Sequence, residues 1–193
     1  MKKLFFAALS ALALFVSCTE DFAGSTPEGN ETPAVDKPAA NEIWYTAAEK
    51  VTPYNSDAFG ATILSNEWDS ETGEGIITFD GAVTSIGNEA FKNCSSLTSI
   101  NIPKGVNSIK YHAFAGCSNL TKIFCKPTTP PSIYYQSNPK KGSFPFNSEM
   151  IIYVPTGSYD DYIQYSTSNN SMGYIEQANW YQYESYIQPY DFN

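Results

Sequence analysis

The sequence predicts a solenoid of short stacked β-strands, rich in β-structure, with short helical or irregular turns between the strands. Two observations lead to this fold class. A 23-residue stretch that begins at Val83, VTSIGNEAFKNCSSLTSINIPKG, is followed by a second copy, VNSIKYHAFAGCSNLTKIFCKPT, that begins at Val106. The positions shared by the two copies are apolar, and the positions between them are polar or small. One repeat of this kind cannot close its own core, so consecutive repeats must stack on each other.

A short strand is predicted at the end of each copy, in the segments LTSINI and LTKIFC. Alternate side chains of a strand point to opposite faces. Ile100 and Ile123 should therefore point inward, and Asn101 and Phe124 should point outward. Stacking in register would place Asn101 beside Phe124.

The 23-residue period can be extended in both directions. Ile77, in the segment IITFDG, lies 23 residues before Ile100 and predicts a further strand in register. Downstream, the segment MIIYVP repeats the ending of INIP around Ile152, 29 residues after Ile123. We interpret PPSIYYQSNPKKGS as a loop inserted in this longer interval. Four stacked strands are thus predicted within residues 76–155, with Thr78 and Tyr153 extending the outward ladder.

The exposed ends of such a stack need covers. Residues 42–75 are expected to cover one end with a β-hairpin, because ATILSNEWDSETGEG reads as two short strands around an acidic turn. Residues 156–193 are expected to form a helical aromatic cap at the other end. This cap should begin with Ser158 as the N-cap of a helix over YDDYIQY. Its packing residues should be Trp180, Tyr183, Tyr186 and Ile187.

The complete repeat has Ile-Gly or Ile-Lys ahead of Ala-Phe, then a Cys, a Leu and a strand of the form L-x-x-L-x-L. This unit resembles the BspA-type leucine-rich repeat of bacterial surface proteins. The resemblance extends from about Gly60 to Asn193, since a strand that ends in Val-Pro is commonly followed in this family by a Tyr-containing helix and then a Trp-containing one. It implies a leucine-rich-repeat solenoid that serves as a surface binding or adhesion module.

The first 17 residues are predicted to be a signal peptide. The apolar run from Leu4 to Val16 contains 13 residues, which as a helix would measure about 20 Å, less than a hydrocarbon core of ~30 Å. The end of the run resembles a bacterial lipoprotein signal, with the small Ser17 before Cys18, although Phe15 stands where that motif usually has Leu. We expect Cys18 to carry a lipid. The alternative is an ordinary secretory signal followed by an incidental cysteine.

Residues 18–41 are rich in Pro, Thr, Ala and Glu, and they predict a flexible tether because they have little apolar surface to bury. The acidic pair Glu20-Asp21 resembles the surface-export signals of some Gram-negative lipoproteins. The chain is therefore expected to be an outer-membrane lipoprotein, exposed at the cell surface and anchored in the membrane through the lipid on Cys18.

The charge composition excludes one class of partner. The chain carries 20 acidic residues against 11 basic ones, for a formal net charge of −9. It contains no arginine, and removal of residues 1–17 takes away Lys2 and Lys3 and no acid. A field of this sign repels phosphate backbones, and without Arg no bidentate phosphate contact can form. We therefore expect no binding of nucleic acid.

The cysteines and the single histidine offer little catalytic chemistry. Cys94 and Cys117 share one repeat position, which allows either a disulfide or two packed thiols, and we expect packed thiols because their side chains should run parallel. Cys125 should point inward like Ile102. His112 should lie in a solvent-facing turn. No metal-binding spacing and no nucleophile paired with a base can be assembled, so we expect no cofactor, no metal and no enzymatic activity.

Two groups of acidic residues have structural interpretations. Asp69, Glu71 and Glu74 could hold calcium weakly, but they lack the dense alternation of a calcium loop, and we interpret them as a solvated hairpin turn. Asp160 and Asp161 are suitably placed to interact with the positive end of a helix.

Two surfaces are candidates for ligand binding. The first is the outward strand face, with Asn101, Phe124 and Tyr153 in a line and Lys122 and Ser99 at its side. The second is an aromatic platform at the C-terminal end. Eight of the 14 tyrosines lie between Tyr159 and Tyr190, too many to be buried by one small helix. The rings left over would be Tyr181, Tyr186 and Tyr190.

Two functions are compatible with these features. In the first, the chain is a surface-tethered binding or adhesion module of a Gram-negative bacterium that captures a protein or glycan ligand. In the second, it is an accessory glycan-binding lipoprotein of a carbohydrate uptake system. The second function predicts that glycan binding depends on exposed aromatic rings.

Overall fold

The computed structural model describes residues 38–134, 142–145, 147–164 and 180–192. These residues belong to one compact unit, Ala34–Asn193. The predicted signal peptide, Cys18 and residues 18–37 of the predicted tether lie outside the described ranges.

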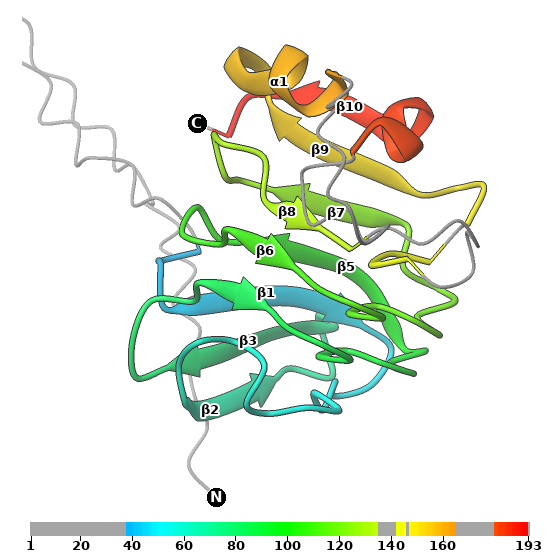
Figure 1. Cartoon of the computed structure of the whole chain (residues 1–193). Coiled ribbons are helices and arrows are strands. Elements are labelled where there is room, and N and C mark those ends of the chain that lie inside the picture. The colour runs from blue at the N-terminus through cyan, green and yellow to red at the C-terminus, as the bar shows by residue number, and fades with distance from the viewer. Residues whose placement is uncertain (1–37, 135–141, 146, 165–179, 193) are drawn as a thin grey trace, which may run out of the picture. The chain divides into compact units, whose positions relative to one another are not determined.

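Two β-sheets make up most of this unit (Figure 1). The larger sheet has seven strands in the order β10-β9-β7-β5-β1-β3-β2, and the smaller has three in the order β4-β6-β8. The strands of the larger sheet, in chain order, are β1 (Glu42–Ala47), β2 (Ile63–Trp68), β3 (Glu74–Phe79), β5 (Leu97–Ile102), β7 (Lys122–Cys125), β9 (Ile151–Pro155) and β10 (Ile187–Tyr190). Those of the smaller sheet are β4 (Ser85–Ile86), β6 (Ser108–Ile109) and β8 (Ser132–Ile133).

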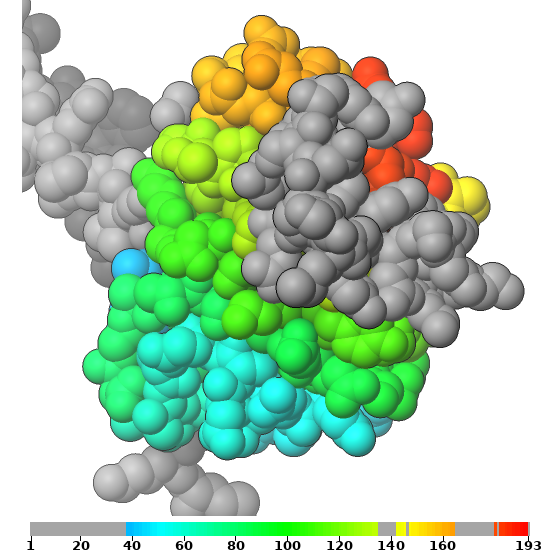
Figure 2. Space-filling model, viewed as in Figure 1, coloured from blue at the N-terminus to red at the C-terminus, as the bar shows by residue number. Residues whose placement is uncertain are grey.

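The sequence repeat corresponds to a stack of parallel strands. In the larger sheet β5, β7 and β9 pair in parallel, with Ile100 opposite Ile123 and Ile123 opposite Ile152. In the smaller sheet Ile86 lies opposite Ile109. The predicted pairing of equivalent repeat positions is thus confirmed at both sheets. In the space-filling view, successive segments follow each other as bands from cyan through green to orange (Figure 2).

The prediction for the strand around Ile77 was wrong in one respect. We expected β3 to lie directly beside β5, but β1 lies between them and pairs antiparallel with both (Figure 1). Ile43 faces Ile77, and Tyr45 faces Ile100. The segment before residue 60, outside the family resemblance, therefore contributes a strand to the middle of the sheet. Its inward residues Ile43, Tyr45 and Ala47 are buried, in an alternation typical of a strand with one covered face.

A column of phenylalanine rings runs through the core. The rings of Phe91 and Phe114 are stacked, with centroids 5.4 Å apart and planes 7° from parallel. Phe144 continues the stack on Phe114 at 5.4 Å and 8°, and Phe59 meets Phe91 edge-on at 5.5 Å. All four side chains are buried. The predicted inward stacking of Phe91 on Phe114 is confirmed, and the column is longer than the two copies of the repeat suggest.

Phe144 marks a further copy of the repeat that the sequence reading missed. The amide of Phe114 donates to the carbonyl of Ser143, as the amide of Phe91 donates to that of Ala113. Ser143 therefore takes the position of the repeat's alanine. Its buried hydroxyl donates to the carbonyl of Ile109 at 2.7 Å and accepts the amide of Tyr134 at 3.0 Å. The stretch interpreted as an inserted loop thus contains β8 at one end and the repeat's Ser-Phe pair at the other, and its residues 135–141 lie outside the described part.

The turns of the repeat share an unusual backbone conformation. Glu89 and His112 occupy equivalent positions and have φ of 58° and 54°. Asn93 and Gly116, also equivalent, have φ of 60° and 79°. Positive φ is unfavourable for most side chains and mild for Asn or Gly. The repeat therefore fixes the backbone path of these turns as well as the side chains that point inward.

The predicted β-hairpin is present. β2 and β3 pair antiparallel, and the turn at residues 69–73 joins them. The carboxylate of Asp69 accepts the amide of Glu71 at 2.7 Å, and its carbonyl accepts the amide of Gly73 at 2.8 Å. These bonds are within the turn, as expected for acidic residues that shape a hairpin.

The C-terminal segment contains short helices and a last strand. These helices are η2 (Thr156–Ser158), α1 (Tyr159–Ile163) and η3 (Trp180–Tyr186). Ser158 precedes α1 at the N-cap position, but its hydroxyl makes no capping hydrogen bond, because its backbone belongs to the preceding turn η2. Asp160 and Asp161 lie in the first turn of α1, as predicted. Among the described residues, no helix is long and apolar enough to cross a membrane.

Candidate functional site

The outward face of β5, β7 and β9 carries the ladder that the sequence predicts. Asn101 pairs with Phe124, and Phe124 pairs with Tyr153. The residues on either side of Phe124 in β7, Ile123 and Cys125, are buried in the core, so strand alternation turns Phe124 outward. Asn101, Phe124 and Tyr153 are all half-buried.

Phe124 and Tyr153 are covered in part by the end of the chain. Their rings stack with centroids 5.0 Å apart and planes 15° from parallel. Tyr190, the last residue of β10, meets Phe124 edge-on at 5.8 Å and Tyr153 edge-on at 5.3 Å. Phe192 lies against Tyr190 at 4.9 Å. We call Phe124, Tyr153, Tyr190 and Phe192 the strand-face aromatic cluster.

This arrangement joins the two surfaces that the sequence treats as alternatives. Tyr190, predicted for the C-terminal platform, is 44% exposed and belongs to the strand face. Tyr186 is half-buried and packs against the core, so it contributes little ring surface. The side chain of Tyr181 lies outside the described part. Trp180, Tyr183 and Ile187 are buried, as the packing interpretation of this segment predicts.

Two lysines lie beside the cluster on β7 and just after it. Lys122 is exposed and pairs with Ser99 on one side and Ile151 on the other. The amine of Lys126 lies 5.5 Å from the centre of the Phe192 ring, within the range of a cation–π interaction. The cluster thus presents aromatic rings next to positive charge, in a chain with an excess of acidic residues.

The predicted ladder differs from the observed one at its other end. Thr78 pairs with Glu42 of β1 and is not adjacent to Asn101. Because Tyr45 lies opposite Ile100, the outward position between β3 and Asn101 belongs to Trp44. The indole nitrogen of Trp44 donates to the Glu42 carboxylate at 2.8 Å. Trp44 extends the line of rings across the face.

Ser99 is not available as a contact residue. Its side chain is only 9% exposed, and its hydroxyl is 2.7 Å from that of Thr46 on β1. The intervening strand β1, which the sequence did not predict at this place, therefore covers this side of the predicted site.

The described thiols are protected from ionisation. Cys94, Cys117 and Cys125 are free. Burial raises the pKa of Cys94 to about 11 and the pKa of Cys117 and Cys125 to about 12. Near neutral pH these thiols stay protonated, and a protonated thiol is a poor nucleophile. They act as small packing groups, and Cys117 also donates to the carbonyl of Phe91 at 2.9 Å.

The single histidine lies in a turn but is less exposed than predicted. His112 is half-buried, and its ring stacks on Tyr111 with centroids 3.6 Å apart. Within the described ranges, no group of three His, Cys, Asp or Glu side chains is placed to hold a metal ion.

Comparison with known protein families concerns the middle of the chain. Residues 74–153, from the start of β3 to Tyr153 in β9, match the family model described as BspA type leucine rich repeat region (6 copies). These residues are leucine-rich repeats. No curated protein matches the chain.

The leucine-rich repeats supply only part of the candidate site. Asn101, Phe124 and Tyr153 lie within the matched region, whereas Trp44, Tyr190 and Phe192 lie outside it. The sequence reading missed Trp44 and Phe192. The alternation in EIWYTA was a signal for Trp44, because it turns the tryptophan to the face opposite Ile43 and Tyr45. No local pattern shows that Phe192 returns to Tyr190 and Lys126.

Proposed function

We propose that this chain is a binding module tethered to the surface of a Gram-negative bacterium, and that it captures a protein partner with the outward face of its leucine-rich repeats. One observation carries the proposal: the strand-face aromatic cluster gathers four rings from three separate parts of the chain on one flat face. Partly exposed aromatic side chains beside a cation are the residues that contribute most binding energy in protein interfaces. Leucine-rich-repeat domains generally bind proteins.

The geometry proposed for binding is a short solenoid. Residues 76–155 would form its coils, and residues 42–75 and 156–193 would close its ends, with β1 added as an antiparallel strand within the sheet. The parallel pairing of β5, β7 and β9 supports this arrangement. A face built from paired strands is rigid, so the rings lose little conformational freedom when a partner binds.

The proposed role is non-catalytic. It is supported by the protonated state of the buried thiols and by the position of His112 in a turn against Tyr111. The proposed attachment is a lipid on Cys18 in the outer membrane, with residues 18–41 as a tether. It is supported by the apolar run before Ser17 and by the acidic pair after Cys18. A tether would allow several weak contacts to act together at a cell surface.

The binding proposal can be tested with an array of immobilised extracellular-matrix and bacterial-surface proteins probed with the full chain. We expect binding to at least one protein and a loss of about 30-fold or more for Tyr190→Ala, because a central interface ring is worth about 2 kcal/mol. Tyr190 is exposed, so this change should leave the fold intact. Lys122→Glu, which reverses an exposed charge on the same face, should weaken binding as well.

Matched controls are available elsewhere on the chain. Tyr54 is 62% exposed, and Tyr54→Ala removes a similar ring away from the proposed face. Lys50→Glu makes the same charge change as Lys122→Glu. If the control pair weakens binding as much as the strand-face pair, the face is wrongly assigned. Binding to glycans and to no protein would reject protein capture and favour the uptake function.

A further inference from the structure

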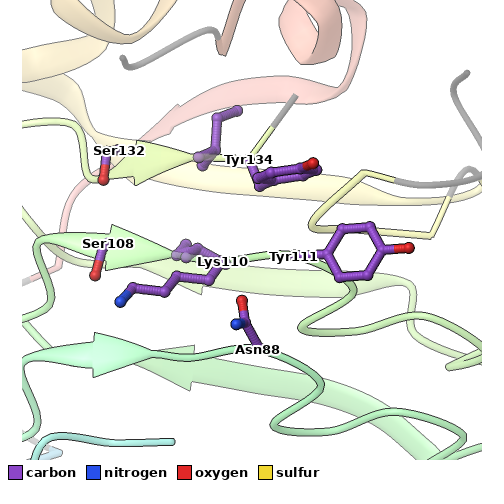
Figure 3. Close-up of a pocket in the computed structure, with 8 residues that line it drawn as sticks. Asn88, Ser108, Lys110, Tyr111, Ser132 and Tyr134 are labelled. Atoms are coloured by element: carbon purple, nitrogen blue, oxygen red, sulfur yellow. The ribbon is translucent and has the colours of Figure 1, made fainter. Parts of the chain in front are cut away.

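A pocket opens on the smaller sheet, which is separate from the strand face. It has a volume of about 440 Å³, within the range of about 300–1,000 Å³ that is usual for small-ligand sites. Eight residues from the turn after β4 and from β6, β8 and the residues after them line it: Asn88, Ser108, Ile109, Lys110, Tyr111, Ser132, Ile133 and Tyr134 (Figure 3).

The repeat brings these residues together. β6 and β8 pair in parallel, with Ser108 opposite Ser132. Lys110 and Tyr134 each follow the isoleucine of their strand, so they occupy equivalent positions on neighbouring coils. Asn88 is the equivalent of Tyr111 one period earlier. The pocket is therefore formed by side chains that replace each other between copies, which are the positions where a repeat can vary without loss of its core.

Two tyrosines form one wall. The ring of Tyr134 meets that of Tyr111 edge-on, with centroids 5.0 Å apart and planes at 77°. Two rings at this angle make a corner of aromatic surface. Such a corner can pack against the apolar C–H face of a sugar ring while the sugar's hydroxyl groups stay in contact with polar neighbours.

The opposite side of the pocket carries polar donors. Figure 3 shows the Lys110 side chain extended between Ser108 and Asn88. Lys110 is the one charged residue among the eight that line the pocket. Within the described ranges, its amine has no ion-pair partner. In a chain with 20 acidic residues against 11 basic ones, this leaves an uncompensated cation facing a pocket with hydroxyl and amide groups.

We propose that this pocket binds a pyranose that carries a carboxylate, such as a uronic or sialic acid residue, either free or at the end of a glycan. Lys110 would pair with the carboxylate, the Tyr111–Tyr134 corner would pack against the ring, and Ser108 and Asn88 would hydrogen-bond to hydroxyl groups. A phosphate group fits less well, because the pocket offers one ammonium and no planar guanidinium fork. A neutral sugar would leave the ammonium unused.

The site requires several contacts to act together. A partly exposed ion pair is worth little alone, so neither the lysine nor the rings should suffice. We expect a Kd on the order of 1 mM for a single sugar. The proposal does not depend on protein capture by the strand face, since the two sites lie on different sheets.

The test uses the full chain and ligand-observed NMR with matched sugars. Glucuronate and glucose differ at one carbon, where a carboxylate replaces a hydroxymethyl group, and N-acetylneuraminate is a second acidic probe. We expect at least one acidic probe to bind about 10-fold more tightly than glucose. Lys110→Met keeps the length of the side chain and should abolish this preference. Tyr111→Ala should weaken binding of both sugar types.

Controls separate the site from general charge effects and from misfolding. Lys50→Met makes the same charge change outside the pocket and should leave binding unchanged, and all variants should melt within a few degrees of the native chain. An oligosaccharide ending in glucuronate distinguishes the source: tighter binding than free glucuronate indicates a glycan end, and equal binding indicates the single sugar. The proposal is overturned if Lys110→Met retains the acid preference, if no acidic sugar binds, or if acetyl-dialanine, a peptide carboxylate, binds as tightly as the acidic sugars.

Discussion

Replacement of Phe114 by alanine should remove the centre of the phenylalanine column. Phe114 is fully buried and stacks on Phe91 and Phe144, each with centroids 5.4 Å away. Burial loss and the resulting cavity cost about 3–5 kcal/mol for Phe→Ala. Each of the two stacked pairs contributes about 0.5–1.5 kcal/mol beyond area burial. We therefore expect a loss near the upper end, about 4–5 kcal/mol.

This loss is large compared with the stability of the whole unit. Natural domains unfold with about 5–15 kcal/mol, and for a chain of this length each kcal/mol shifts the melting temperature by about 2–4 °C. The expected fall in melting temperature is therefore roughly 10–20 °C. Urea unfolding followed by circular dichroism gives the change in free energy, and a single transition shows that the coils unfold together.

Two comparisons make the result specific to the column. Phe114→Leu keeps most of the apolar volume but loses both ring stacks, so it should cost clearly less than Phe114→Ala. Combining Phe91→Ala with Phe114→Ala should give a coupling energy of about 0.5–1.5 kcal/mol, because the two rings are in contact. A loss under about 1 kcal/mol for Phe114→Ala would place the ring outside the core and would refute the alignment of the repeats.

Two further predictions concern ionisation and anchoring. Stability should fall above about pH 9, because burial raises the pKa of Cys117 and Cys125 from 9.0 to about 12. The folded state keeps the protons that the unfolded state releases, so each thiol's contribution is complete below the unfolded pKa and decreases by about 1.4 kcal/mol per pH unit above it. In urea unfolding at pH 8 and pH 10.5, the native chain should lose about 4 kcal/mol more than a Cys117→Ala/Cys125→Ala variant; equal losses would contradict protected thiols. For the anchor, Cys18→Ala should abolish metabolic labelling with a radioactive or clickable fatty acid and release the chain from the membrane fraction, while Cys94→Ala should do neither; persistent labelling of the Cys18 variant would exclude lipid attachment there.

The repeat was readable from the sequence because its physical cause is local and periodic. Each copy must place apolar side chains at the same points of a coil, so the same spacing recurs and predicts which residues lie opposite each other. Ile86 and Ile109, Ile100 and Ile123, and the Phe91–Phe114 stack all follow from this rule. The outward positions of Phe124 and Tyr153 follow from it too, since strand alternation fixes the face once the inward residues are known.

Less regular copies hid the rest of the column. Ser143 replaces the alanine of the repeat, and the spacing to Phe144 is longer, so the pair reads as loop sequence. Its identity as a repeat position depends on hydrogen bonds to Phe114 and Ile109 that only the folded chain forms. Ala58-Phe59 was visible as a repeat-like pair, but it lies outside the regular period.

Tertiary structure alone decided the composition of the candidate site. The sequence indicated two separate surfaces, one on the strands and one near the C-terminus, because nothing local specifies where the chain returns after η3. The parallel pairing of β10 with β9 brings Tyr190 to Phe124 and Tyr153. In the same way, the insertion of β1 between β3 and β5 replaces Thr78 by Trp44 beside Asn101. Strand pairing between distant segments is set by hydrogen bonds and burial summed over the whole sheet, so a pattern within any one segment determines the face of a side chain but not its neighbours.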